Sequence, residues 1–151
     1  MKLEKAVGLN HIRLIAESQM AMALESEGLR LDKNSLSQGI QEVLNNPLRG
    51  SYYLCFNKEN EFLGMLMTQI EWSDWRNQEV LWIHSVYIKP EYRRQGVYSF
   101  MYNSLKAEAS LVKKIAGIRL YVDKTNLKAQ KTYEALGMTN EHYDLYECMD
   151  L

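Results

Sequence analysis

Apolar residues recur with two different periods along this chain, and the change from one period to the other predicts the order of its elements. Two segments near the N-terminus show the helical period. The first spans about Asn10 to Glu27 and ends at Gly28, and the second follows Asp32 and stops at Asn46-Pro47. Asp32 is a suitable N-cap, and the residue before a proline disfavours helix. We therefore expect two helices before the first long strand.

Three segments rich in β-forming residues follow these helices. They span Tyr52 to Asn57, Phe62 to Trp72 and Val80 to Ile88. The polar turn Lys58–Glu61 separates the first two, and the loop from Trp72 to Asn77 precedes the third. This spacing predicts consecutive strands joined by short turns.

The rest of the chain alternates between helical and strand patterns. The expected segments are a helix from Gly96 to about Lys114, a strand from Ile118 to Val122, a short helix from Asn126 to Leu136 closed by Gly137, and a last strand from Tyr143 to Met149. A strand–helix–strand unit inside a largely antiparallel sheet makes the fold class α+β, or mixed α/β. The length of 151 residues fits a single domain, residues 1–151.

The junction between the third strand and the following helix carries the clearest chemical signal. The strand runs into Pro90, and Arg93, Arg94 and Gly96 follow before the helical pattern begins. A loop that ends a strand and opens a helix leaves backbone N–H groups without partners inside the helix. Together with the helix dipole, these groups form a site for an anion, typically phosphate. The two arginines add mobile positive charge.

Composition and charge limit the classes of function that this protein can have. Hydrophobic residues at 46% and charged residues at 25% are ordinary globular values, and a net charge of -1 argues against a basic nucleic-acid-binding surface. Cys55 and Cys148 lie far apart and match no metal-ligand spacing, so we expect two reduced thiols. No segment has the apolar run of a signal peptide or a membrane span. These features predict a cytoplasmic protein that binds neither nucleic acid nor membrane.

Two spaced motifs resemble those of the GCN5-related N-acetyltransferase (GNAT) superfamily over nearly the whole chain. Ile88-Lys89-Pro90 and Arg93-Arg94-Gln95-Gly96-Val97-Tyr98 match the acetyl-CoA motif, in which Gln or Arg-x-x-Gly-x-Gly or Ala opens the helix. The chain departs from the motif at Tyr98, where the family has a small residue. Tyr98 can still donate its backbone N–H if its side chain points away from the cofactor.

The second motif, Asn-x-x-Ala-x-x-x-Tyr-x-x-x-Gly, is matched by Asn126, Ala129, Tyr133 and Gly137 with the correct spacing. The resemblance implies a mixed, mostly antiparallel sheet of six to seven strands flanked by about four helices. Within the superfamily, Glu71 to Asn77 and Gly117 to Tyr121 look like a bacterial branch without an assigned substrate.

By this resemblance the protein is expected to be an acetyl-CoA-dependent N-acetyltransferase. Backbone amides of Arg94 to Ser99 would hold the pyrophosphate, and the backbone of Val86 to Ile88 would pair with the pantetheine arm like an added strand. The expected cofactor-binding residues are Val86, Tyr87, Ile88, Arg93, Arg94, Gln95, Gly96, Val97, Tyr98, Ser99 and Asn126. Acetyl-CoA is the expected co-substrate, and no metal ion is expected.

Two residues are the expected catalytic groups. Tyr133 matches the family's proton donor to the CoA sulfur, and a phenol is protonated at neutral pH; alternatively it packs between helix and sheet. His84, expected on the same strand face as Trp82, Val86 and Ile88, occupies a position where many family members carry Glu. It is either a general base or a buried structural histidine. Glu71 is a second candidate base, or else a surface carboxylate.

The resemblance implies an amine acceptor, either a small molecule or a peptide, without selecting one, and it allows a homodimer. Aromatic residues of the Trp72–Trp75 loop, with Trp82, Tyr52 and Tyr53, suit either an acceptor pocket or core packing. The competing hypotheses are a non-catalytic acyl-CoA-binding domain and a purely structural domain, for which acetyl-CoA would not raise thermal stability.

Overall fold

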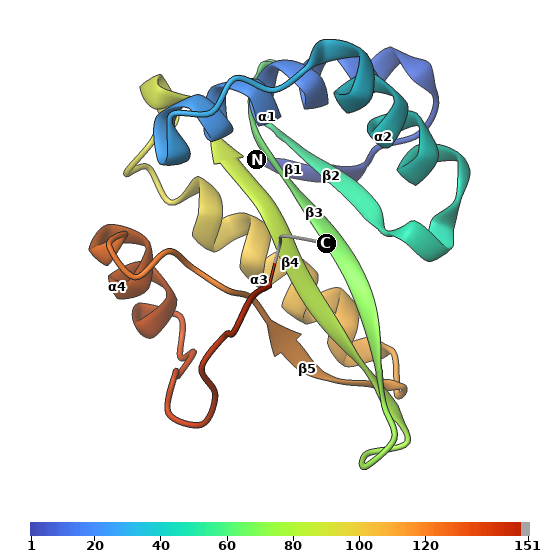
Figure 1. Ribbon diagram of the computed structural model, residues 1–151, viewed down its shortest axis with the longest axis vertical. Helices are drawn as coiled ribbons and strands as arrows, with labels where there is room; N and C mark the ends of the chain where they lie inside the picture. The colour runs from blue at the N-terminus through green and yellow to red at the C-terminus, as the bar shows by residue number, and fades with distance from the viewer. Residues whose placement is uncertain (149–151) are drawn as a thin grey trace. The chain divides into compact units, whose positions relative to one another are not determined.

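A single mixed sheet organises the first four fifths of the protein, whose computed structural model describes residues 1–148. The described residues contain five strands, in the order β1 (Lys2–Lys5), β2 (Ser51–Phe56), β3 (Phe62–Ser73), β4 (Gln78–Ile88) and β5 (Ile115–Arg119). Neighbouring strands from β1 to β4 run antiparallel, whereas β5 pairs parallel to β4 (Figure 1). The α+β class and the β4–helix–β5 unit predicted from the sequence are confirmed.

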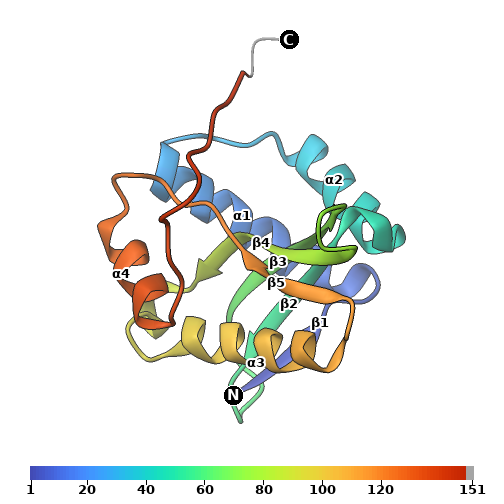
Figure 2. The ribbon, with the colours of Figure 1, turned by 90° about the horizontal axis from the view of Figure 1, so that it is seen from below.

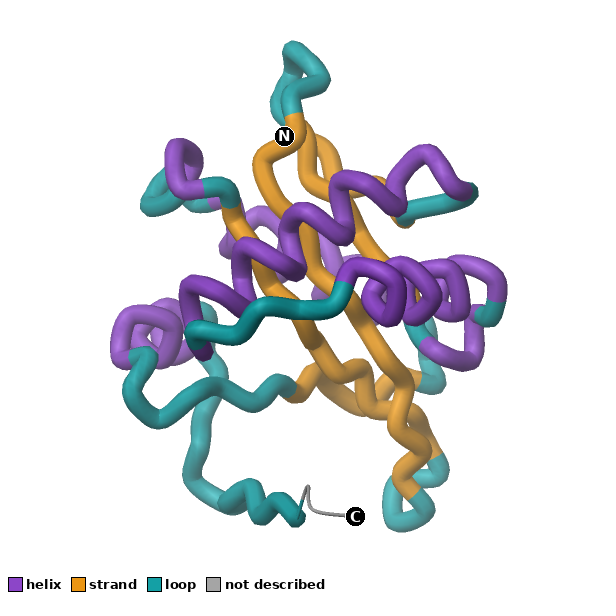
Figure 3. Tube along the Cα trace, turned by 45° about the horizontal axis from the view of Figure 1, so that its top comes forward, coloured by secondary structure: helices purple, strands orange, loops and turns teal. Residues whose placement is uncertain are grey.

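Helices cover both faces of this sheet. α1 (Ile12–Glu27) and α2 (Lys33–Asn45) lie on one face, and α3 (Val97–Leu111) lies on the other (Figure 2). In Figure 3 the first two helices cross in front of the strands. The chain divides into two compact units, Met1–Arg119 and Leu120–Leu151. The second unit contains α4 (Leu127–Ala135) and is described by itself.

The main core lies between the sheet and the pair α1 and α2. Ile15 of α1, Ile40 of α2, and Leu54 and Met65 of the sheet are completely buried there. On the opposite face, α3 buries its own apolar stripe, which includes Met101 and Leu105. Each such side chain contributes roughly 1.5–3 kcal/mol through removal from water. The helical periodicity of the sequence therefore corresponds to real packing faces.

The predicted ends of the first two helices are confirmed. Gly28 adopts the left-handed conformation after α1, with φ of 67°. Asp32 caps α2, because its carboxylate oxygen Oδ1 accepts a hydrogen bond of 2.8 Å from the backbone N–H of Ser35. In the second unit, Asn126 caps α4 through Ala129, and Gly137 closes the helix with φ of 81°.

The predicted number of strands is wrong: the described residues form five strands rather than six to seven. The strand predicted at Ile118–Val122 begins and ends three residues earlier, as β5. Residues 143–148 form no strand, and Met149 lies outside the described residues. In contrast, β1 was not predicted, because Lys2–Lys5 contains one apolar residue and pairs only at the sheet edge.

The predicted end of the third helix at Lys114 is also wrong, since α3 ends at Leu111. Val112 has an extended backbone, and the carbonyl of Lys114 accepts a hydrogen bond of 2.7 Å from the N–H of Glu79 in β4. Sheet pairing therefore draws Lys114 out of the helix. This competition is a tertiary effect that the local pattern does not contain.

Candidate functional site

The loop between β4 and α3 (Lys89–Gly96, the β4–α3 loop) has the geometry of an anion site. A short 3-10 turn at Pro90–Tyr92 leads to Arg94 and Gly96, which have φ of 64° and 76°. Gly96 is the N-cap of α3, and the first hydrogen bond of the helix runs from the N–H of Phe100 to the carbonyl of Gly96, at 2.9 Å. The N–H groups of the first turn therefore have no acceptor within the helix, as at the N-terminus of any α-helix, and such a terminus favours an anion.

Two features favour glycine at position 96: the backbone conformation and the open space where a Cβ atom would lie. Its positive φ disfavours any residue with a Cβ atom. No atom lies within 4 Å of the position that a Cβ at Gly96 would occupy. Because the site for that atom is open, the glycine is not explained by packing, and its backbone can be approached closely from outside.

The side chain of Tyr98 lies along α3. Its ring stacks on that of Tyr102, one helical turn further on, with centroids 6.3 Å apart and planes at 30°. This position leaves the backbone of Tyr98 in the first turn of the helix. Tyr98, which stands where the family motif has a small residue, is therefore compatible with an anion site made of backbone groups.

The two arginines of the loop differ in their surroundings. Arg93 donates from Nε to the carbonyl of Ile88 at 2.8 Å and from its terminal nitrogen to Glu25 of α1 at 2.6 Å. Its guanidinium also lies 5.7 Å from the ring centre of Tyr87. Arg93 is thus anchored, contrary to the expected mobile charge. Arg94 is exposed and forms no ion pair in the described part of the chain.

β4 contains a bulge at its centre. Met67 of β3 pairs with His84, whereas Met65 pairs with Tyr87, so Ser85 and Val86 together oppose one residue of β3. Ser85 has φ of 48°. Such a bulge bends a strand and alters its twist. The pairing of β4 with β5 spans Glu79 to Trp82, and β4 then continues to Ile88 beyond its last β5 partner.

The bulge changes which side chains share a face. His84 and Tyr87 lie on the face covered by α1 and α2, because their partners Met67 and Met65 belong to the core on that side. Val86 and Ile88 flank Tyr87 and therefore point to the opposite face. The prediction that these two residues share the face of His84 is wrong, since it assumed an unbroken alternation. The prediction that Trp82 shares the face of His84 is confirmed, because the two rings stack with centroids 6.1 Å apart.

Glu71 and Arg119 complete the surroundings of Trp82. One oxygen of Glu71 accepts from the indole N–H of Trp82 at 2.7 Å, and the other accepts from Arg119 at 2.9 Å. Both carboxylate oxygens are therefore engaged, and the ion-pair partner of Glu71 is Arg119. We did not predict Arg119 as a site residue from the sequence. An arginine between the apolar residues Ile118 and Leu120 was a usable signal.

The protonation of His84 follows from its position. Burial lowers the pKa of this imidazole below its ordinary value, because a half-buried site disfavours the charged form. His84 is therefore neutral at pH 7. A neutral imidazole can accept a proton, which a permanently protonated group cannot.

The predicted residues of the second motif lie in the second unit. The Oδ1 of Asn126 accepts from the N–H of Ala129 at 3.1 Å, at the start of α4. Tyr133 lies in the last turns of this helix, is half-buried, and has its pKa raised by burial, so its phenol is protonated at neutral pH. The spacing in the sequence thus corresponds to one capped helix that carries both residues.

Residues 1–148 contain neither a metal-binding cluster nor a membrane-spanning helix. No group of three or more His, Cys, Asp or Glu side chains is arranged to hold a metal ion there. Within the same residues, every helix is too short or too polar to cross a bilayer. Cys55 and Cys148 are both free thiols, and burial raises the pKa of Cys55 to about 11.

Known proteins resemble this chain in sequence and fold. The crystal structure of a possible acetyltransferase from Clostridium difficile 630 is 35% identical, with a TM-score of 0.90 over 99% of this chain and 97% of that one. A predicted acetyltransferase from Clostridium acetobutylicum, solved with acetyl-CoA, shares the fold at 19% identity, with a TM-score of 0.75 over 98% and 96% of the two chains.

A curated relative matches over a shorter segment. The thialysine N-epsilon-acetyltransferase of Bos taurus is 33% identical over 75 residues, which are 50% of this chain and 43% of the bovine protein. The model of the acetyltransferase (GNAT) family matches residues 18–138, and this segment includes β4, the β4–α3 loop and α4. This protein therefore belongs to the acetyltransferase (GNAT) family.

Proposed function

We propose that this protein is an N-acetyltransferase that moves the acetyl group of acetyl-CoA to a primary amine of a small molecule or peptide. The observation that carries the proposal is the β4–α3 loop. Its backbone has a positive φ at Arg94 and Gly96 and leads directly into the N-terminus of α3, where N–H groups and the helix dipole favour an anion. Family membership supports the same conclusion.

The residues proposed to hold CoA are mainly backbone groups. The amides from Arg94 to Ser99 would bind the pyrophosphate, with the exposed Arg94 adding charge, and Asn126 is proposed as a further cofactor-binding residue. The backbone from Val86 to Ile88 lies beyond the last β4–β5 pair, where an extended ligand arm could pair with it. Acetyl-CoA, when bound, supplies the acetyl group as a thioester.

The proposed reaction balances with two protein groups. The amine nitrogen forms a bond to the acetyl carbon while the bond from that carbon to sulfur breaks. His84 accepts the proton that the amine loses, and Tyr133 donates its phenol proton to the departing thiolate. The lowered pKa of His84 and the raised pKa of Tyr133 both favour these starting states. Glu71 is less suited as a base, since both its oxygens are engaged.

The acceptor is proposed to be a primary amine. The bovine relative is described as acting on the N-epsilon group of thialysine, which is a primary amine on a flexible chain. The half-buried face around His84 and Trp82 lies under α1 and α2, where a chain-like amine could approach the base from outside the cofactor loop.

A CoA-release assay against a library of primary and secondary amines tests this proposal. We expect release of free CoA that requires both acetyl-CoA and a primary amine. Acetyl-CoA should also raise the melting temperature by mass action, independently of turnover. Stabilisation without transfer to any amine would favour a non-catalytic acyl-CoA-binding domain. The absence of both effects would contradict the proposed function.

A further inference from the structure

Three neighbouring strands place the surroundings of Trp82 on one face of the sheet. Trp82 pairs with Gln69 of β3 on one side and with Arg119 of β5 on the other, so these residues share a face. Glu71 lies two positions after Gln69, and His84 lies two positions after Trp82, so both point the same way. The side chains of β3, β4 and β5 can therefore form one connected group here.

Hydrogen bonds and charge fix the indole of Trp82 within this group. Its N–H donates to one carboxylate oxygen of Glu71 at 2.7 Å, and Arg119 donates to the other oxygen at 2.9 Å. The guanidinium carbon of Arg119 also lies 5.9 Å from the centre of the indole ring, which is a cation–π distance. The torsion that turns an aromatic ring has a broad minimum, so these contacts, rather than the rotamer, hold the indole in one orientation.

Glu71 and Arg119 contribute little to stability as an ion pair. Their side chains are 44% and 33% exposed, and pairs at such exposure are weak because water screens them. A carboxylate that accepts from both an indole and a guanidinium nevertheless has a defined position. The pair is therefore better explained by the orientation that it gives Trp82 than by stabilisation of the fold.

The imidazole of His84 lies against this indole. The ring centroids are 6.1 Å apart and the planes are inclined by 23°, which is an offset-stacked arrangement. The ring torsion of histidine is also broad. A stacked imidazole turns less freely, because rotation out of the stack loses the contact with the indole. A general base needs such a restriction, since its ring nitrogen must lie within hydrogen-bond reach of the proton that it takes.

The backbone supports His84 less firmly than Trp82. Within the described residues, Trp82 is the last position of β4 that pairs with strands on both sides. His84 pairs with Met67 of β3, and Ser85 follows at the bulge with φ of 48°. A bulge interrupts the ladder and alters the local twist. Contact with Trp82, on the regular part of the strand, compensates for this interruption.

From this arrangement we propose that Trp82 is a positioning residue, which holds the imidazole of His84 in the orientation that accepts a proton from the acceptor amine. Glu71 and Arg119 act one step further away, by fixing the indole. The proposal rests on the function proposed above and deepens it, since His84 is the base there. It gives Glu71 a part in the reaction without making it a base.

Substitution of Trp82 tests the stacking. The assay is CoA release at saturating acetyl-CoA, with the amine that reacts fastest in the library. Trp82→Leu removes the flat ring, and kcat should fall by roughly tenfold, because a small misplacement of a reacting group is costly. Trp82→Phe restores a ring that can stack and should recover most of this loss. Acetyl-CoA affinity, measured by calorimetry, should be unchanged in both variants. An unchanged kcat in Trp82→Leu, or equal losses in the two variants, would contradict the inference.

Substitution of Glu71 tests whether the indole must be fixed. Glu71→Leu removes both hydrogen bonds, and kcat should fall by roughly three- to tenfold with acetyl-CoA affinity unchanged. Glu71→Gln keeps a carbonyl oxygen that can accept from the indole, so its loss should be smaller. Glu59→Leu, at an exposed position in the turn between β2 and β3, is the control and should change neither value. An unchanged kcat in Glu71→Leu, or equal losses in the leucine and glutamine variants, would exclude positioning through the indole.

Nuclear magnetic resonance gives a readout that does not depend on turnover. In protein with labelled histidines, the ring signals of His84 are those lost in His84→Gln. We expect nuclear Overhauser effects between these ring protons and the indole of Trp82, and weaker effects in Glu71→Leu. Overhauser effects in a protein that transfers acetyl to no amine would contradict the proposed function, whereas transfer without them would contradict only the positioning by Trp82.

Discussion

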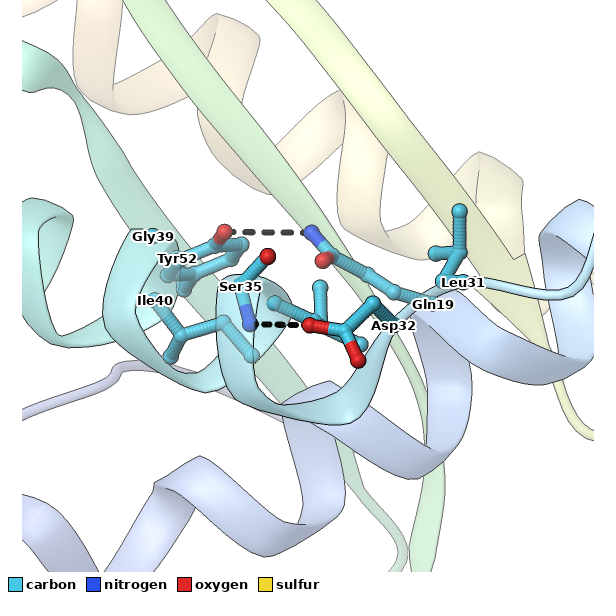
Figure 4. A pocket seen from close by; sticks show the side chains of 8 residues that line it. Gln19, Leu31, Asp32, Ser35, Gly39, Ile40 and Tyr52 are labelled. Carbon is cyan, nitrogen blue, oxygen red and sulfur yellow. Dashed lines mark hydrogen bonds between the residues drawn. The ribbon is translucent and has the colours of Figure 1, made fainter.

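The β4–α3 loop and the cavity between α1, α2 and β2, which Gln19 and Tyr52 line (Figure 4), bring polar groups together in different ways. At the loop, the polar groups are the backbone N–H groups that open α3, while the side chains of Tyr98 and Arg93 make other contacts. In the cavity, the polar groups are side chains that come together from distant positions, such as Gln19 and Tyr52. A backbone site tolerates side-chain change wherever the conformation survives. A side-chain site loses its chemistry when one residue changes.

The largest effect is expected from Gly96→Glu, which places bulk and negative charge in the open space before α3. Affinity for acetyl-CoA should fall by roughly 1,000-fold, or about 4 kcal/mol, as measured by calorimetry. Gly28→Glu is a matched control, because Gly28 also has a positive φ and open space around its Cβ position. Both variants should lose about 1 kcal/mol of stability from backbone strain. Equal cofactor affinity in the two folded variants would contradict the backbone site.

Tyr133→Phe tests the proposed proton donor, a side-chain function outside the loop. The value of kcat should fall by roughly 100-fold, since a positioned acid contributes about that much. Acetyl-CoA affinity should stay the same, because the phenol acts on the leaving group. Tyr146→Phe, at a side chain that is 91% exposed in the same unit, should have no effect. A change in affinity alone would indicate a packing role for Tyr133.

His84→Gln should lower kcat/KM by roughly 10- to 100-fold at neutral pH. In the wild type, a general base acts when it is deprotonated, so activity should rise with pH and reach a plateau. Burial lowers the pKa of His84, which puts the midpoint of this rise below the ordinary value of about 6.5. In His84→Gln the fall in activity at low pH should disappear, whereas His11→Gln should keep it. An unchanged pH profile in His84→Gln would exclude His84 as the base.

Burial of the neutral imidazole also affects stability. Below the unfolded-state pKa, the unfolded chain binds a proton more readily than the folded protein does. The free energy of unfolding should therefore decrease as the pH falls below about 6.5. Above that pH, His84 should have little effect on it. Urea unfolding of wild type and His84→Gln across this pH range measures the difference.

The smallest effect is expected from Glu25→Gln, which removes the ion pair between α1 and Arg93. Both side chains are more than one third exposed, and such pairs contribute at most about 1 kcal/mol. Acetyl-CoA affinity should fall by roughly two- to fivefold as the loop loses one anchor. Glu27→Gln, on the same helix turn and without an ion pair among the described residues, is the control. No difference between the two variants would show that the other contacts of Arg93 suffice.

Local signals in the sequence predicted much of this protein. The caps Asp32, Gly28 and Asn126 act through residues at most a few positions away, and their helices begin or end as expected. The β4–α3 loop was predicted for the same reason, because its glycine and the helix start that follows are properties of one short segment. Strand ends were less predictable, since Lys114 and β1 are recruited by pairing with distant strands.

The sequence by itself determined the end of α1, both ends of α2 and the start of α4 at Asn126, because short-range hydrogen bonds and backbone conformations set them. Only the tertiary structure decided which side chains share a face. The bulge at Ser85 moves Val86 and Ile88 away from His84, and the register of three strands aligns His84 with Tyr52. Register depends on the packing of the whole sheet, so no local pattern contains it.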